Sequence, residues 1–119
     1  MHDDNRFPFQ QLDVYRVAKE FAGRVHRAGI SDAELRDQAT RAAKSAFLCL
    51  CEGLPNDRPA MRRKYFTEAD NSLHEAVGAV DLAAAIGAAG AREAAEIHAE
   101  ALRLRAMLRG LLRATGRGR

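Results

Sequence analysis

Four stretches of the chain repeat apolar residues at intervals of three and four, and this period constrains the fold more than any other feature. The first stretch carries Val14, Ala18, Phe21, Val25 and Ala28. This spacing puts the five side chains on one face of an α-helix, because a helix completes a turn every 3.6 residues. The chain contains no alternating run of β-branched and aromatic residues of the kind that predicts a strand. The pattern therefore predicts an all-α protein.

The other three stretches have the same period. The second comprises Leu35, Ala39, Ala42, Ala46 and Cys49; the third Phe66, Ala69, Leu73, Ala76, Val80 and Ala84; the fourth Ala94, Ile97, Ala101, Leu104, Leu108 and Leu111. We expect helices over about residues 10–28, 32–53, 58–87 and 91–114, and a flexible basic tail at 115–119. Short loops between such helices are typical of an antiparallel up-down-up-down four-helix bundle, here a single domain over 1–119.

Residues at the predicted helix ends suggest particular caps. Ser31 and Glu34 have the spacing of a capping box, and Asp57 is a candidate N-cap for the third helix. Gly29 is suited to a left-handed cap after the first helix.

The N-terminal segment lacks a basic region followed by an apolar one, and no apolar run approaches the roughly 20 residues that span a bilayer. With two cysteines and no secretory signal, we predict a cytoplasmic protein without a membrane partner.

Two cysteines separated by one residue, in Cys49-Leu50-Cys51, raise the question of a thiol site. Side chains two apart on a helix point about 200° away from each other, so the two thiols cannot share a metal or form a disulfide there. The chain supplies neither further cysteines nor a paired-histidine motif for zinc. We therefore expect Cys49 to pack in the core, and a redox or metal role is the less favoured alternative.

Carboxylates and histidines are the other side chains of the sequence that could carry chemistry. A di-metal bundle needs Glu-x-x-His pairs, and no glutamate has a histidine three residues later. General acid–base chemistry would require convergence of groups such as Glu52, Glu68, His74 and Glu75 in one pocket. The interpretation we favour is structural, with Glu52 and Glu75 as buried groups that pair with Arg41 or cap a helix. We predict no cofactor, no metal and no enzymatic activity.

Positive charge is concentrated in two places. Residues 101–119 hold six arginines and no acid, whereas the first 100 residues hold 13 bases against 16 acids. A first cluster opens the predicted third helix and comprises Arg58, Arg62, Arg63 and Lys64. Basic residues at the start of a helix oppose its dipole, so we do not expect this cluster to serve helix stability. Together the two clusters predict a surface that binds nucleic acid without sequence preference. The alternative is a solvated face without a ligand. The candidate contact residues are Arg58, Arg62, Arg63, Lys64, Arg105, Arg109, Arg113 and Arg117.

The second predicted helix is apolar on nearly every side between Ala42 and Leu54. A lone bundle covers only one face of each helix, so we expect a second copy of the chain to bury the remainder. The candidate interface residues are Leu48, Cys51, Leu54, Leu102 and Leu112.

Several spaced motifs resemble the bacterial four helix bundle proteins, the family that includes proteins encoded in intervening sequences of large-subunit ribosomal RNA genes. They are Phe9 with Leu12-Asp13-Val14-Tyr15, then Leu35, Gln38, Arg41-Ala42-Ala43 and Ser45, then Glu52-Gly53, and Ala69-Asp70-Asn71-Ser72-Leu73-His74-Glu75. The resemblance implies a left-handed bundle that assembles into a homo-oligomer, commonly a pentameric ring. A relative, the accessory variability determinant of diversity-generating retroelements, binds nucleic acid and a reverse transcriptase. The sequence departs from the family where Cys49-Leu50-Cys51 precedes Glu52 and where Asn71 replaces a glycine.

The sequence as a whole predicts a non-enzymatic, self-assembling interaction module whose further partner is RNA, DNA or a nucleic-acid enzyme. The alternative is a structural oligomer that binds only protein, and an enzyme ranks third.

Overall fold

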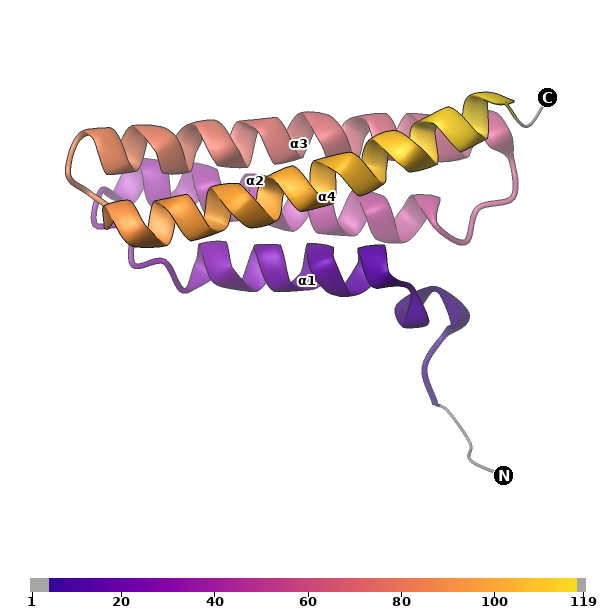
Figure 1. The fold of residues 1–119 in the computed structure, drawn as a ribbon, viewed down its shortest axis with the longest axis horizontal. Coiled ribbons are helices and arrows are strands. Elements are labelled where there is room, and N and C mark those ends of the chain that lie inside the picture. Colours follow the sequence, from indigo (N-terminus) through magenta and orange to yellow (C-terminus); the bar gives the residue numbers. More distant parts are fainter. Residues whose placement is uncertain (1–4, 118–119) are drawn as a thin grey trace.

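The computed structural model describes residues 5–117, and in that part of the chain four α-helices follow a short 3₁₀ turn at Pro8–Gln11 (η1). The helices are α1 (Asp13–His26), α2 (Ala33–Gly53), α3 (Pro59–Ala85) and α4 (Ala91–Arg117). Successive helices run in opposite directions, and each packs against the next, with α1 also contacting α4 (Figure 1). The prediction of an all-α four-helix bundle is confirmed.

Helix ends differ from the expected ones in identifiable ways. Asp32 caps α2 by accepting a hydrogen bond from the Leu35 N–H, at 2.9 Å. The predicted capping box is wrong, because Ser31 instead donates its backbone N–H and its hydroxyl to the carbonyl of Ala88 in the α3–α4 loop. Gly29 has a φ of 70°, the left-handed conformation expected of it.

At α3 the N-cap is Arg58 rather than Asp57, and the Arg58 N–H donates to the Asn56 side chain. The last helix continues to Arg117 rather than fraying after residue 114. Residues 118–119 of the expected tail lie outside the described residues.

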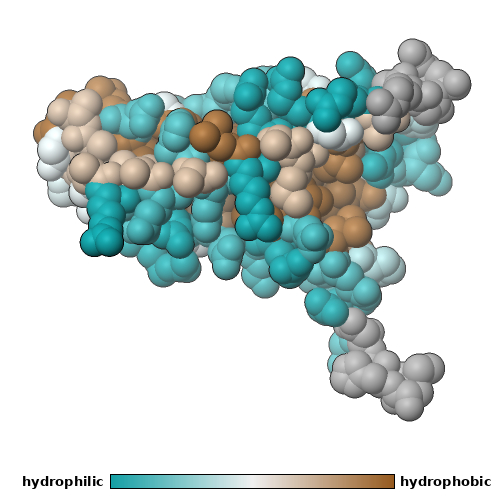
Figure 2. Space-filling view, in the orientation of Figure 1, coloured by the Kyte–Doolittle hydropathy of each residue, from teal (hydrophilic) through white to brown (hydrophobic). Residues whose placement is uncertain are grey.

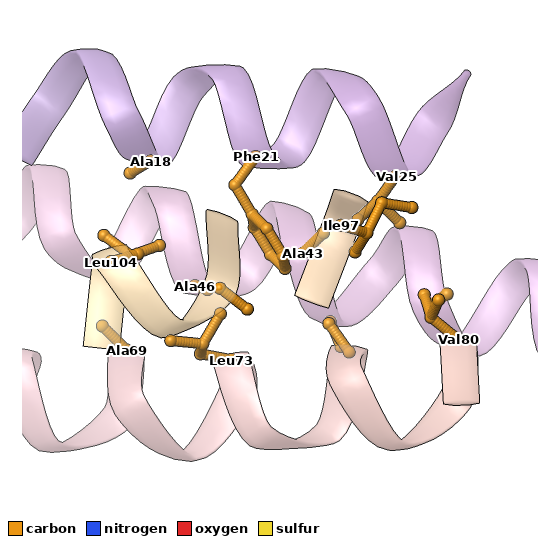
Figure 3. Close-up of a cluster of buried hydrophobic side chains, with 14 of the residues drawn as sticks. Ala18, Phe21, Val25, Ala43, Ala46, Ala69, Leu73, Val80, Ile97 and Leu104 are labelled. Atoms are coloured by element: carbon orange, nitrogen blue, oxygen red, sulfur yellow. The ribbon is translucent and has the colours of Figure 1, made fainter. Parts of the chain in front are cut away.

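Most residues of the four predicted stripes lie in the core, whereas five of them are only partly buried against it: Ala28, Leu35, Cys49, Ala84 and Leu111. Phe21, Phe66, Leu73, Ile97 and Leu104 are each at most 2 % exposed. Figure 3 shows Phe21 reaching from α1 toward the alanines of α2, with Ile97 beside it. Burying each of these larger side chains contributes about 1.5–3 kcal/mol.

The α2–α3 pair is the most extensive helix contact, and small residues make it possible. Its buried alanines are Ala39, Ala42, Ala43, Ala46, Ala69, Ala76, Ala79 and Ala83. Side chains this small let two helix axes approach closely. Gly53 has the tightest packing, because a Cβ there would lie 2.7 Å from a ring carbon of buried Phe66.

The first helix is attached to the last by a cluster of ion pairs. The Arg24 guanidinium lies 2.7 Å from Glu96 and 3.9 Å from Glu93, and its Nε lies 3.5 Å from Glu100. Glu100 contributes most to raising the pKa of Arg24 above its ordinary value. Arg24 Nε and the Glu100 oxygen are buried, and neither makes a hydrogen bond of good geometry. The ion pair between them offsets the cost of burying the two charged groups.

The helices differ in length, with 14 residues in α1 and 27 in α4. At a rise of 1.5 Å per residue, α1 is roughly 20 Å shorter than α4. Much of the difference falls at the end where α3 begins and α4 finishes, beyond the start of α1 (Figure 1). Within residues 5–117 no helix is both long and apolar enough to cross a membrane.

Replacing Gly53 by alanine should lower the free energy of unfolding by about 1–3 kcal/mol, because the new methyl group overpacks the Phe66 ring. Gly78 is the matched control, since it is exposed in the middle of α3 and an added Cβ meets nothing within 4 Å. Gly78→Ala should raise the free energy of unfolding by about 0.5–1 kcal/mol through helix propensity alone. Urea denaturation followed by circular dichroism measures both, and a neutral Gly53→Ala would contradict the close packing of α2 on α3.

Candidate functional site

The two basic clusters of the sequence meet at one end of the bundle. The start of α3 and the end of α4 lie side by side there (Figure 1). Arg63 of α3 donates a hydrogen bond from Nη1 to the carbonyl of Leu112 in α4, at 3.2 Å. Arg63, Arg109, Leu112 and Arg113 line a depression of about 270 Å³, which we call the arginine depression.

Charge in the arginine depression is uncompensated. Among the described side chains, no carboxylate lies within 4.0 Å of Arg63, Arg109 or Arg113. The dipole of α4 accounts for only part of this arrangement, since its effect is confined to the last turn and Arg109 lies two turns before the helix end. Three guanidinium groups from two helices form a surface suited to phosphate or another anion.

Arg62, a predicted nucleic-acid contact, binds backbone carbonyls at the end of α2. Its Nη1 donates to the carbonyls of Gly53, Leu54 and Asn56 at 3.1, 2.7 and 3.1 Å. Its guanidinium also lies 5.0 Å from the Phe66 ring centre. Positive charge is unfavourable at the start of α3, but the C-terminus of α2 lies at the same end of the bundle, and there positive charge is favourable. This neighbouring helix end could not be seen from the residues around Arg62 alone.

The remaining basic candidates are placed as follows. Arg58 and Lys64 are exposed at the start of α3, and the Lys64 ammonium lies 5.9 Å from the Tyr65 ring. Arg105 lies one turn before Arg109 and does not itself line the depression. Arg117 ends α4, but its side chain lies outside the described residues.

Arg105 lines a second hollow, between α3 and α4, of about 240 Å³, which we call the α3–α4 groove. Its walls are largely apolar, and two histidines contribute to them. The lining residues are Leu73, His74, Val77, His98, Ala101, Leu102 and Arg105.

Sequence reasoning missed a further basic surface between α1 and α4. Arg16, Lys19, Arg27 and Arg103 contribute to a hollow of about 510 Å³. Glu20 lines it as well, and Arg16 is paired with Asp13. Acidic residues alternate with these basic residues along α1, so no run of positive charge is visible in the sequence. The surface is less positive than the arginine depression.

An apolar surface lies beyond the start of α1, where that helix is too short to cover its neighbours. Figure 2 shows it as a hydrophobic area between the C-terminal half of α4 and the segment that leads into α1. Phe7, Pro8, Phe9, Leu12, Leu54 and Pro55 line a hollow of about 610 Å³ there, which we call the apolar shelf.

The five predicted interface residues do not share one face. Leu54 lines the apolar shelf but is only 8 % exposed, so its side chain belongs mainly to the chain's own core. Cys51 is half-buried one turn before it, whereas Leu48 is 50 % exposed. Leu102 lies in the α3–α4 groove, and Leu112 lines the arginine depression.

Both cysteines are free thiols with restricted access. Cys49 packs against the core, with its Sγ 3.9 Å from the Ser45 hydroxyl and 4.0 Å from Glu68. Burial raises the pKa of Cys49 and of Cys51 above the ordinary thiol value. A reactive or metal-binding cysteine needs the opposite shift, so these contacts support packing.

The candidate acid–base groups are scattered. The expectation that Glu52 and Glu75 are buried groups, paired with Arg41 or capping a helix, is wrong as to burial, because both side chains are exposed. Glu75 accepts a hydrogen bond from Gln38. Of Glu52, Glu68, His74 and Glu75, it is His74 that lines the α3–α4 groove. Within the part of the chain that the structure describes, no three His, Cys, Asp or Glu residues are placed to hold a metal ion.

Comparison with known protein families identifies a related family. A family model described as 23S rRNA-intervening sequence protein matches residues 10–110. The match ends before Leu112 and Arg113, so it covers the arginine depression only in part. No curated protein matches the chain.

Replacing Arg62 by methionine should lower the free energy of unfolding by about 1.5–3 kcal/mol, because carbonyls at the end of α2 lose a charged donor. Arg58→Met removes the same charge from an exposed position and should change stability by about 0.5 kcal/mol or less. Chemical denaturation of the two variants makes the comparison. Equal losses would show that net charge, rather than the cap, accounts for the effect.

Proposed function

The chain belongs to the 23S rRNA-intervening sequence protein family, and from this premise we propose that it is a non-enzymatic, self-assembling interaction module that binds the phosphate backbone of nucleic acid. The arginine depression is the observation that carries the proposal. It brings together arginine side chains from α3 and α4 that are about fifty residues apart in the sequence.

Phosphate recognition follows from the chemistry of the side chains. Guanidinium groups pair with phosphate oxygens through two parallel hydrogen bonds. Arg105, Arg109 and Arg113 recur once per helical turn, about 6 Å apart along α4, so a flexible phosphodiester chain can contact them in succession. Exposed Lys64 and Arg58 extend the positive surface along α3. Binding of this type releases counterions and tolerates any sequence.

Self-assembly is supported by the apolar shelf. Phe7 and Leu12 are 67 % and 45 % exposed there, beside an end of the bundle that α1 leaves uncovered. A helix or loop from a second copy is the simplest cover for such a surface. The alternative function, a structural oligomer without nucleic-acid affinity, rests on the same shelf and treats the arginines as solvated charge.

Electrophoretic mobility shifts with a short oligothymidylate across a salt series test the nucleic-acid proposal. We expect binding at about 50 mM salt that weakens steeply as salt rises. In the double variant Arg109→Gln/Arg113→Gln, the slope of log affinity against log salt should become shallower by roughly 1.4, because two single-strand phosphate contacts are removed.

The matched control is Arg41→Gln/Arg92→Gln, which removes two charges from exposed positions in α2 and in the first turn of α4. It should leave the slope nearly unchanged. If both pairs of substitutions changed the slope equally, binding would depend on net charge rather than on the arginine depression. If the unmodified protein caused no mobility shift at low salt, the proposal would be refuted.

Self-assembly is tested by Leu12→Asp. Leu12 occupies the N-cap position of α1 in an extended conformation, where aspartate is a favourable cap, so the variant should keep its fold. We expect the unmodified protein to exceed the monomer mass in light scattering and Leu12→Asp to dissociate toward monomer. Ile86→Asp, at a site after α3 that is 55 % exposed, should assemble normally. A monomeric unmodified protein would contradict self-assembly.

A further inference from the structure

The α3–α4 groove has a specific relation to the arginine depression. Both lie on the same seam between α3 and α4, and Arg105, at the margin of the groove, is one helical turn from Arg109 of the depression. An apolar hollow and a row of phosphate-binding groups are therefore adjacent along a single line.

The walls of the groove are mostly apolar. Leu73 and Val77 of α3 face Ala101 and Leu102 of α4 across it, and Leu102 is 53 % exposed. The imidazoles of His74 and His98 contribute aromatic surface from the two helices. Histidine rings and apolar side chains are surfaces on which unpaired bases stack.

His74 is held in a defined orientation. Its Nδ1 lies 2.7 Å from the backbone carbonyl of Asp70, which can only accept, so Nδ1 carries the hydrogen. The Asp70 carboxylate, which has an oxygen buried without a hydrogen bond, lies 3.7 Å from the same nitrogen. In the neutral ring Nε2 is then an acceptor, suited to an N–H group on the edge of a base.

We propose that the α3–α4 groove receives an unpaired nucleobase while the neighbouring phosphates lie along Arg105 and the arginine depression. This inference rests on the proposed nucleic-acid function and names its ligand class, a single strand. A duplex keeps its bases stacked and paired, so it offers the groove no base and contacts the arginines alone.

The test compares three probes by fluorescence anisotropy: an oligothymidylate, an abasic strand of equal length and charge, and a duplex. We expect the unmodified protein to bind oligothymidylate about tenfold more tightly than the abasic strand, the scale of one base-stacking contact. Thymine also presents an N–H group, the donor that an accepting His74 Nε2 requires.

The double variant His98→Ala/Leu102→Ala should reduce oligothymidylate binding to the abasic level and leave abasic binding unchanged. Leu82→Ala is the matched control, because Leu82 is 52 % exposed on α3 and does not line the groove. Arg109→Gln/Arg113→Gln should weaken the binding of all three probes.

Each remaining outcome is decisive. Equal affinity of the unmodified protein for oligothymidylate and the abasic strand overturns the base site but leaves backbone binding intact. Failure of all three probes to bind refutes the nucleic-acid function itself. If His98→Ala/Leu102→Ala dissociates the oligomer and leaves the preference for bases unaltered, the groove is a contact between copies and the base site is wrong.

Discussion

The close packing of α2 on α3 is the constraint on which the rest of the molecule depends. Alanines along both helices and Gly53 at the end of α2 bring the two axes together, and Phe66 fills the space that Gly53 leaves. Arg62 then reaches the terminal carbonyls of α2, so the helix end is closed by its neighbour. This packing fixes where α3 begins, and therefore where α4, returning along α3, carries Arg109 and Arg113 to Arg63.

The sequence predicted the fold because the apolar period is a property of each helix by itself. Helix ends were less predictable, because several neighbouring residues can serve as caps. Ser31 and Asp32 both have capping side chains, and the choice between them depends on the Ala88 carbonyl, more than fifty residues away in the sequence. The short α1 illustrates the same limit, since its apolar stripe reaches Val14 but η1 precedes Asp13 as a separate turn.

The candidate site was predictable in composition but not in arrangement. Arg62 and Arg63 are adjacent in the sequence and look equivalent there, yet consecutive residues on a helix point about 100° apart. One of them therefore turns to the end of α2 and the other to α4. Likewise, nothing in the local sequence connects His74 with His98, and only the antiparallel pairing of α3 and α4 places both on one groove.

The apolar shelf and the arginine depression lie at the same end of the bundle, and this proximity links the two halves of the proposed function. Each chain offers few phosphate contacts, so one copy alone would hold nucleic acid weakly at physiological salt. Copies joined through the shelf would carry their depressions close together, and a strand bound at one would meet the next at high effective concentration. Assembly would then supply affinity without any new contact, which accounts for a small basic site beside an uncovered apolar surface.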